Sequence, residues 1–511
     1  AGAASGMLSL IKTSLCLQHR VLPAWSDNPR NESSFRLQKP FSFGNFSTPW
    51  LKNADEPSRK AAVVLKSGKG SSEWILSENE SSPRFEQHAR KGSYCFLPIS
   101  ANNSEEFMKK LGELEKDPEL LECPKNFQYR TFQDFQNADA EFSMVLLAEN
   151  PSKLKEEIIQ AQKSVSRCFE DGKDWQTPSG SFFTTKPLGQ EKIAFVYPGG
   201  FNTYVGSGNS LFEMDPELHE RSLSYSSKIK TLLHPEFLFP QSPNFQSEEE
   251  LKQLQQQFYD SPNPMFESGI SSAVLATQVM RNAFGIEPHA AFGYSMGEVS
   301  MLFSLGVWGS MDPMSEVLNA SPLFHERIAG PMNSVREYWK LKDTDFQNES
   351  LWNWYTLRAE PELVAKALEK RERVYLVLIN TPQEVVIAGE PSACKELIQE
   401  LKCESHEIPV TDVVHCPPVQ SEYEEIKKVH TNKVVDKPKV DFFSATDYTI
   451  TSLDSEILAD NIARFYGRTV DFSKLVEEVY RSGARIFIDM GPRSSCARWI
   501  SENLGDRPHL S

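Results

Sequence analysis

The stretch Phe292-Gly-Tyr-Ser-Met-Gly-Glu298 decides the fold of this 511-residue chain. Before it, residues 273–285 have the apolar spacing of an amphipathic helix, and residues 286–292 end in an apolar run typical of a short buried strand. Helical spacing returns over residues 299–305. Ser295 therefore lies between a strand and a helix, with a glycine two residues away on either side, which is the arrangement of a nucleophile elbow.

This arrangement predicts that Ser295 is a catalytic nucleophile. The flanking glycines permit a strained turn and let other groups approach the serine oxygen. The helix that follows would point its free N–H groups and the positive end of its dipole at the serine, which suits a developing oxyanion. A chance match is the alternative, because G-x-S-x-G is a short pattern, and the flanking strand and helix favour the functional interpretation.

Length and charge limit the class of protein. A chain of 511 residues is expected to form about two to four domains. The formal net charge of -16 argues against sequence-independent nucleic-acid binding and against binding to anionic membranes. The sequence contains no apolar run of about 18 residues, so no membrane span is predicted.

The eight cysteines are scattered and no C-x-x-C pair occurs, so neither a zinc site nor a redox motif is predicted. Scattered cysteines in a long chain fit a reducing compartment, and we expect a cytoplasmic protein. The first residues, Ala1–Lys12, lack the basic region of a signal peptide and an initiator methionine. We expect the chain to be a fragment of a longer polypeptide.

Residues 1–80 begin with a helical pattern and end with two strands joined by a Gly/Ser-rich turn. Gly2-Ala-Ala-Ser-Gly-Met7 and Phe43-Gly-Asn-Phe-Ser-Thr-Pro-Trp50 resemble the C-terminal end of a β-ketoacyl synthase domain of multidomain fatty acid and polyketide synthases. The resemblance implies a partial segment of thiolase-type fold. The family's cysteine nucleophile would lie upstream of Ala1, so we expect a degenerate ketosynthase-like piece without that activity.

Two further units are predicted. Residues 81–189 show a strand, helix, strand, helix pattern with Asn103 as a helix N-cap, which predicts the α/β linker that synthases of this family place after the ketosynthase. In residues 190–500 a strand runs into Pro198-Gly-Gly200, and α/β proteins place their sites at such strand ends. Strands and a helix over residues 340–410 predict a small ferredoxin-like subdomain.

A serine hydroxyl needs a base within hydrogen-bond reach. Among the ten histidines, five lie in polar or charged stretches and are expected to be solvated: His219, His234, His325, His406 and His430. His415 differs, because Val413-Val-His-Cys-Pro-Pro418 places it after a strand and before two prolines. We predict that His415 is the general base, with a surface or satisfied core histidine as the alternative.

Residues 190–500 resemble the malonyltransferase domains that move acyl groups from CoA to an acyl carrier protein. The landmarks are Phe195-Val-Tyr-Pro-Gly199, Gly293-Tyr-Ser-Met-Gly297, Asn380-Thr-Pro382 with Gly389, Val413-Val-His-Cys416 and Met490-Gly-Pro492. The resemblance implies a parallel-sheet, hydrolase-like core in which Ser295 takes the acyl group from acyl-CoA and the carrier's phosphopantetheine thiol takes it from Ser295. It also implies His415 as general base and acid, an oxyanion hole from the N–H groups of Gly200 and Met296, and no metal or bound cofactor.

Two departures from the family pattern concern the site. The usual Pro-Gly-Gln-Gly is Pro198-Gly-Gly-Phe201 here, which keeps a backbone donor. Malonyl-type members carry an arginine that pairs with the free carboxylate. Arg327 fits this role if seven extra residues precede it, with Arg336 as the fallback and a surface arginine as the alternative. If Arg327 faces the pocket, malonyl is the acyl group; otherwise a monocarboxylic acyl group is favoured.

A narrower resemblance concerns Leu305-Gly-Val-Trp308, Leu318–Phe324 and Ala329–Trp339, which are similar to the acyltransferase-bearing subunit of polyunsaturated fatty acid synthases. Related glycolipid-type lipid synthases are similar as well. We therefore predict an acyltransferase within a polyunsaturated fatty acid or polyketide-type synthase, with an acyl carrier protein and other synthase domains as partners. Two alternatives remain open. One is a serine hydrolase or thioesterase, for which Asp412 is the nearest acid before His415, and the other is a non-catalytic scaffold.

Overall fold

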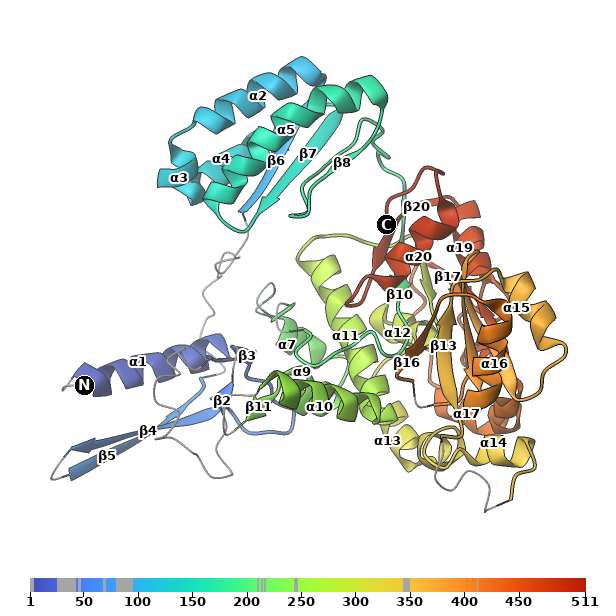
Figure 1. Ribbon diagram of the computed structural model, residues 1–511. Coiled ribbons are helices and arrows are strands. Elements are labelled where there is room, and N and C mark those ends of the chain that lie inside the picture. Colours follow the sequence, from blue (N-terminus) through green and yellow to red (C-terminus); the bar gives the residue numbers. More distant parts are fainter. Residues whose placement is uncertain are drawn as a thin grey trace. The chain divides into compact units, whose positions relative to one another are not determined.

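The computed structural model describes residues 4–24, 43–44, 47–67, 70–79, 95–208, 211–212, 215, 217–242, 247–342, 350–410 and 412–511. The chain forms two compact units, one that joins Ala1–Phe85 to Glu191–Ser511 and one that comprises Glu86–Gln190 (Figure 1). Of the helices in these ranges, none is both long and apolar enough to cross a bilayer.

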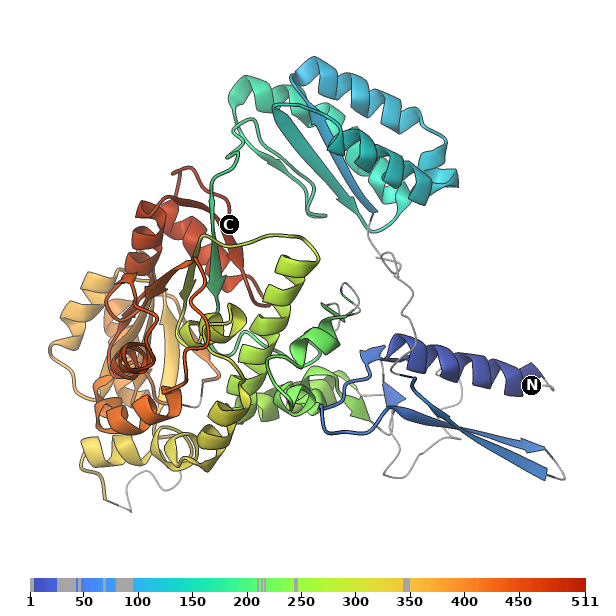
Figure 2. The same ribbon diagram turned by 180° about the vertical axis from the view of Figure 1, so that it is seen from behind.

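A five-stranded sheet forms the centre of the larger unit (Figure 1 and Figure 2). Its strands, in spatial order, are β18 (Thr449–Ile450), β17 (Asp441–Ser444), β12 (Ala290–Gly293), β10 (Lys192–Tyr197) and β20 (Ala484–Asp489). β10 pairs in parallel with β12 and β20, and β12 pairs in parallel with β17, whereas β18 is antiparallel. The predicted parallel-sheet α/β core is confirmed.

Burial explains the sequences of the inner strands. Residues 194–197 of β10 and 290–292 of β12 are almost completely buried, as is usual for parallel strands with helices on both faces. The helices of this unit that bear on the site are α11 (Pro262–Asn282), α12 (Gly297–Ser304), α18 (Ser455–Tyr466), α19 (Phe472–Arg481) and α20 (Ser495–Leu504). Others are α7 (Leu218–Ser222), α8 (Ile229–Leu232), α9 (Pro235–Leu238), α10 (Glu248–Tyr259), α13 (Asp312–Ala320), α14 (Asn333–Tyr338) and α17 (Tyr423–His430).

The turn between β12 and α12 is too tight for side chains at its two glycines. A Cβ atom on Gly297 would lie 1.9 Å from the carbonyl oxygen of Tyr197, and one on Gly293 would lie 2.1 Å from the amide nitrogen of Glu298. Ser295, between them, has a φ of 56°, in the left-handed region that a residue with a side chain rarely adopts. The glycines therefore hold the helix against the end of β10 and present the serine at the turn.

A second five-stranded sheet of this unit belongs to the predicted ferredoxin-like subdomain. Its elements follow one another as β13 (Asn353–Leu357), α15 (Pro361–Leu368), β14 (Val374–Thr381), β15 (Glu384–Gly389), α16 (Pro391–Leu401) and β16 (Ser405–Ile408). This is the β-α-β-β-α-β order of ferredoxin-like folds. The strands lie in the order β16-β13-β15-β14, and β19 (Val470–Asp471) extends the sheet in parallel beside β14.

The second unit is a mixed α/β module. An antiparallel sheet in the order β6-β7-β9-β8 consists of Cys95–Ala101, Phe142–Ala148, Phe182–Phe183 and Trp175–Gln176. Its helices are α2 (Ser104–Lys116), α3 (Glu119–Glu122), α4 (Pro124–Gln136) and α5 (Pro151–Asp171). As predicted, Asn103 caps α2, and its side chain accepts a hydrogen bond of 2.9 Å from the amide of Glu106.

Ion pairs connect the N-terminal segment to the rest of the larger unit. It contains α1 (Ala4–His19), β1 (Val21–Leu22), β3 (Thr48–Pro49), β4 (Lys60–Ser67) and β5 (Gly70–Ser77), and β2 (Phe43–Gly44) pairs with β11 (Gln241–Ser242). The buried Arg59 and the half-buried Arg20 both pair with Glu78, and Arg20 also contacts Glu220. The ketosynthase-like nature of this segment stays a prediction.

We expect Gly297→Ala to lower the free energy of unfolding by about 1–3 kcal/mol or more, because the added methyl group overlaps the Tyr197 carbonyl. Urea denaturation of the purified chain measures this change. The matched control is Gly200→Ala on the facing loop, where an added Cβ meets no atom within 4 Å. Equal stability of the two variants would contradict the steric account of the elbow.

Candidate active site

The structure brings Ser295 and His415 together although they are 120 residues apart in the chain. Ser295 Oγ lies 2.7 Å from His415 Nε2. On the other side of the ring, Nδ1 lies 3.0 Å from the carbonyl oxygen of Phe465 in α18. That carbonyl can only accept, so Nδ1 carries the proton and Nε2 is free to accept the proton of the serine hydroxyl.

His415 is uncharged at neutral pH. Its side chain is buried, and burial lowers its pKa to about 4. Phe465 and Tyr466 pack beside the imidazole ring, with ring centroids at 5.6 and 6.1 Å. The backbone N–H of His415 also donates a hydrogen bond of 2.6 Å to the Tyr466 carbonyl. These contacts fix the ring in the orientation of a general base.

A backbone carbonyl therefore replaces the third, acidic member of a Ser-His-Asp triad. Asp412, the nearest acid before His415 in the chain, also lies at the site, but its Oδ1 atom is buried and has no hydrogen-bond partner among the described residues. Burial raises the pKa of this carboxyl group to about 6. The pair is a Ser–His dyad without a carboxylate behind the histidine.

Gly200 and Met296, the two predicted oxyanion donors, both line the cavity that contains Ser295. No described residue accepts a hydrogen bond from the N–H of either one. The loop before Gly200 packs on the elbow, since a Cβ on Gly199 would lie 3.0 Å from the Tyr294 ring and 3.1 Å from the Tyr294 carbonyl oxygen. The Asn202 side chain braces this loop by donating to the Gly199 carbonyl at 3.2 Å.

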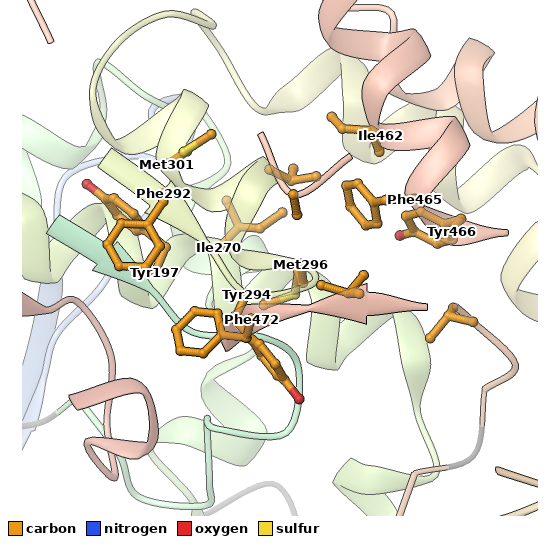
Figure 3. Close-up of a cluster of buried hydrophobic side chains, with 14 of the residues drawn as sticks. Tyr197, Ile270, Phe292, Tyr294, Met296, Met301, Ile462, Phe465, Tyr466 and Phe472 are labelled. Carbon is orange, nitrogen blue, oxygen red and sulfur yellow. The ribbon is translucent and has the colours of Figure 1, made fainter. Parts of the chain in front are cut away.

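The cavity beside the dyad has a volume of about 280 Å³. Most of its wall is apolar and comes from the helical and the ferredoxin-like parts of the unit: Met265, Phe266, Phe324, Trp354, Leu378, Val386, Ile408, Val410, Val414 and Trp499. The elbow itself is part of the buried core, as Figure 3 shows for Tyr294 and Met296 beside Ile270 and Phe472. Such a wall suits an apolar ligand and limits the access of water to the serine.

A hydrogen-bonded chain that the sequence did not predict connects the elbow to the subdomain. Tyr294 donates a 2.7 Å hydrogen bond to Asn380, which donates one of 3.0 Å to Glu384. Glu384 also accepts from the Trp499 indole at 2.7 Å. Asn380 belongs to the Asn-Thr-Pro motif, so the sequence could have indicated a role for it at the site. The role of the Phe465 carbonyl could not be predicted, because every residue has a backbone carbonyl.

Arg327 does not join the dyad. Its guanidinium makes a bidentate pair with Glu337, at 2.6 and 2.7 Å, and contacts Glu422 at 2.7 Å. These hydrogen bonds raise the pKa of Arg327 above its usual value. Neither Arg327 nor Arg336 lines the cavity that contains the dyad. The carboxylates of Glu337 and Glu422 therefore already bind the guanidinium N–H groups of Arg327 that a malonyl carboxylate would need.

The expectation that His219 and His430 are solvated is wrong. His430 is fully buried and donates from Nδ1 to the Ile426 carbonyl at 2.7 Å, and its pKa is lowered to about 4 by burial. His219 is also buried and contacts the Lys52 backbone. Both histidines lie on short helices that are mostly polar in sequence, but each histidine faces the interior.

Among the described residues, no cluster of three His, Cys, Asp or Glu side chains is placed to hold a metal.

Comparison with solved structures places this geometry in a known fold. The acyl transferase domain of SpnD aligns with a TM-score of 0.59 and 15% identity over 82% of this chain and 90% of that domain. The acyltransferase domain from module 8 of the salinomycin polyketide synthase aligns with a TM-score of 0.58 and 20% identity over the same shares. The chain has the acyltransferase-domain fold.

Sequence comparison agrees with this fold. The chain is 28% identical over 560 residues to a polyunsaturated fatty acid synthase subunit of Thraustochytrium sp., covering all of this chain and 26% of the relative. It is 21% identical to the non-reducing polyketide synthase PKS19 of Phaeosphaeria nodorum, covering 98% of this chain and 26% of the relative. The chain thus spans about a quarter of these relatives. No protein-family model matches it.

We expect the rate at which a fluorophosphonate labels Ser295 to stay constant from about pH 8 to pH 5 and to fall as His415 takes up a proton near pH 4, its lowered pKa. Circular dichroism at each pH shows whether the chain stays folded. Ser295→Ala is the control and should not be labelled. A midpoint near the ordinary histidine value of about 6.5 would contradict the buried, neutral imidazole.

Proposed function

We propose that this chain is an acyltransferase that moves an acyl group from a CoA thioester to the phosphopantetheine thiol of an acyl carrier protein. The observation that carries the proposal is the 2.7 Å contact between Ser295 and His415 beside an apolar cavity in an acyltransferase-domain fold. Similarity along the whole chain to a polyunsaturated fatty acid synthase subunit supports a synthase of that type, or of polyketide type, as its setting.

In the first half-reaction, Ser295 Oγ attacks the thioester carbon while His415 Nε2 accepts its proton. The tetrahedral oxyanion faces the N–H groups of Gly200 and Met296. The CoA thiolate then leaves, takes the proton from His415 and leaves acyl-Ser295. In the second half-reaction His415 accepts the carrier's thiol proton, the thiolate attacks the acyl-serine, and Ser295 leaves with that proton.

We also propose an assignment of domains along the chain. Residues 1–80 are a degenerate ketosynthase-like end, residues 81–189 an α/β linker, and residues 190–500 the acyltransferase domain with its small subdomain at 340–410. The partners are the carrier protein and other synthase domains, and the compartment is the cytoplasm. All eight cysteines are free thiols, which fits a reducing environment.

Intact-mass spectrometry after incubation with malonyl-, acetyl- and longer acyl-CoAs tests the chemistry. At least one donor should add the mass of a single acyl group, and Ser295→Ala should add none. His415→Ala should acylate about 10²–10⁴-fold more slowly, because general-base catalysis is lost.

Addition of holo-carrier protein separates transfer from hydrolysis. We expect the carrier to discharge acyl-Ser295 much faster than water does. Equal discharge with and without the carrier would favour the thioesterase alternative. If no donor modifies the chain, the acyltransferase and thioesterase hypotheses both fail and the non-catalytic scaffold is the hypothesis that remains.

The identity of the acyl group divides the proposal into two candidates. Malonyl-CoA is the donor that the sequence predicts, and it would require Arg327 to leave Glu337 and Glu422. A monocarboxylic acyl chain needs no cation and is favoured by the apolar cavity wall.

We expect Arg327→Ala to leave the ratio of malonyl to octanoyl acylation of Ser295 within about twofold of the parent, because the structure holds this side chain outside the cavity. Competition of the two CoA esters, read by intact mass, gives the ratio. Arg371→Ala is a matched control, since that arginine is also held by two glutamates. A selective loss of malonyl in Arg327→Ala would establish Arg327 as the carboxylate partner.

A further inference from the structure

One arginine does reach the cavity. Arg493 lies in the loop between β20 and α20 and lines the cavity together with Ser295. Among the described lining residues there is no lysine and no second arginine. Its side chain is exposed, whereas Ser295 and His415 lie deeper, so Arg493 marks the mouth of the cavity.

The charge of Arg493 is not neutralised by the described part of the chain. Its guanidinium donates a 3.0 Å hydrogen bond to the Tyr259 hydroxyl and lies 5.1 Å from the centroid of the Tyr204 ring. No described carboxylate pairs with it. Arg327, by contrast, is held by two glutamates. In a chain of net charge -16, an open cation at a cavity mouth creates a local site for an anion.

The loop that carries Arg493 is anchored to the oxyanion loop. Ser495 donates a hydrogen bond of 3.1 Å to Asn202, the residue that braces the Gly199 carbonyl. The carboxylate of Asp489 accepts from the amides of Cys496 and Ala497 at 3.0 and 3.2 Å, which fixes the start of α20. The backbone between these anchors is therefore held in place relative to the dyad.

The backbone at Arg493 itself is strained. Its φ is 74°, and that of Ser494 is 50°, so two successive residues with side chains adopt the left-handed region. Such conformations cost free energy and persist where the surrounding contacts impose them. The Asp489 and Ser495 hydrogen bonds supply these contacts here.

We propose that Arg493 binds the phosphate diester of the phosphopantetheine arm, the anionic group that acyl-CoA and the acyl carrier protein share. This inference rests on the proposed function. The thioester must reach Ser295 inside the cavity, so the rest of the arm leaves through the mouth and brings its phosphate outside. A guanidinium pairs well with phosphate oxygens. An acyl carboxylate would instead lie at the inner end, away from the mouth.

A pair of donors that differ only in the phosphate tests the proposal: acyl-4′-phosphopantetheine and acyl-pantetheine. We expect the parent chain to acylate Ser295 at least about tenfold more efficiently with the phosphorylated donor, mainly through KM. Arg493→Ala should remove this preference and leave acyl-pantetheine within about twofold, and Arg493→Lys should restore part of it. Arg481→Ala, on the exposed face of α19, removes the same charge and should change neither donor.

The second half-reaction tests whether the site is shared. Arg493→Ala should raise the KM for holo-carrier protein in the discharge of acyl-Ser295 by a similar factor. A loss confined to one half-reaction, an equal loss with both donors, or a loss that depends on a carboxylate in the acyl group would overturn the proposal. If the parent chain forms no acyl-Ser295 with any donor, the proposed function fails instead.

Discussion

The close contact between Gly297 and the Tyr197 carbonyl is the constraint on which the site depends. It allows α12 to begin directly at the end of β10, with no room for a Cβ. The residues between β12 and this helix must then turn sharply, and Ser295 adopts a positive φ as a result. Backbone packing therefore fixes the position of Ser295, independently of its contact with His415.

The base is likewise positioned by the backbone. Because the Phe465 carbonyl accepts the Nδ1 proton, His415 keeps one tautomer without a buried carboxylate. A buried ion would have cost desolvation free energy in this apolar environment. The two side chains remain neutral at rest. Under the proposed function, charge would develop only in the transition state, where the Gly200 and Met296 amides could stabilise it.

Under the proposed function, charge around the site would separate recognition of the acyl group from recognition of the arm that carries it. Glu337 and Glu422 engage Arg327, so the inner wall of the cavity offers no open cation among the described residues. Arg493 places one at the mouth. The acyl end would then be selected by shape and hydrophobic contact, and the arm by its phosphate. In an acidic protein, such a local positive charge would attract anionic substrates to the cavity.

Local sequence patterns, namely glycine spacing and apolar runs, predicted the elbow and the strands and helices around it. The segment before two prolines pointed to His415 as the partner of Ser295. The parallel core and the ferredoxin-like type of the insert were expected from the family resemblance. Only the tertiary structure decided the surroundings. The ion pairs of Arg327, the burial of His430 and the arrival of Arg493 at the cavity each depend on which distant elements pack together. The Phe465 carbonyl is a backbone group that every residue has, so its hydrogen bond to His415 could not be predicted from the type of residue at position 465.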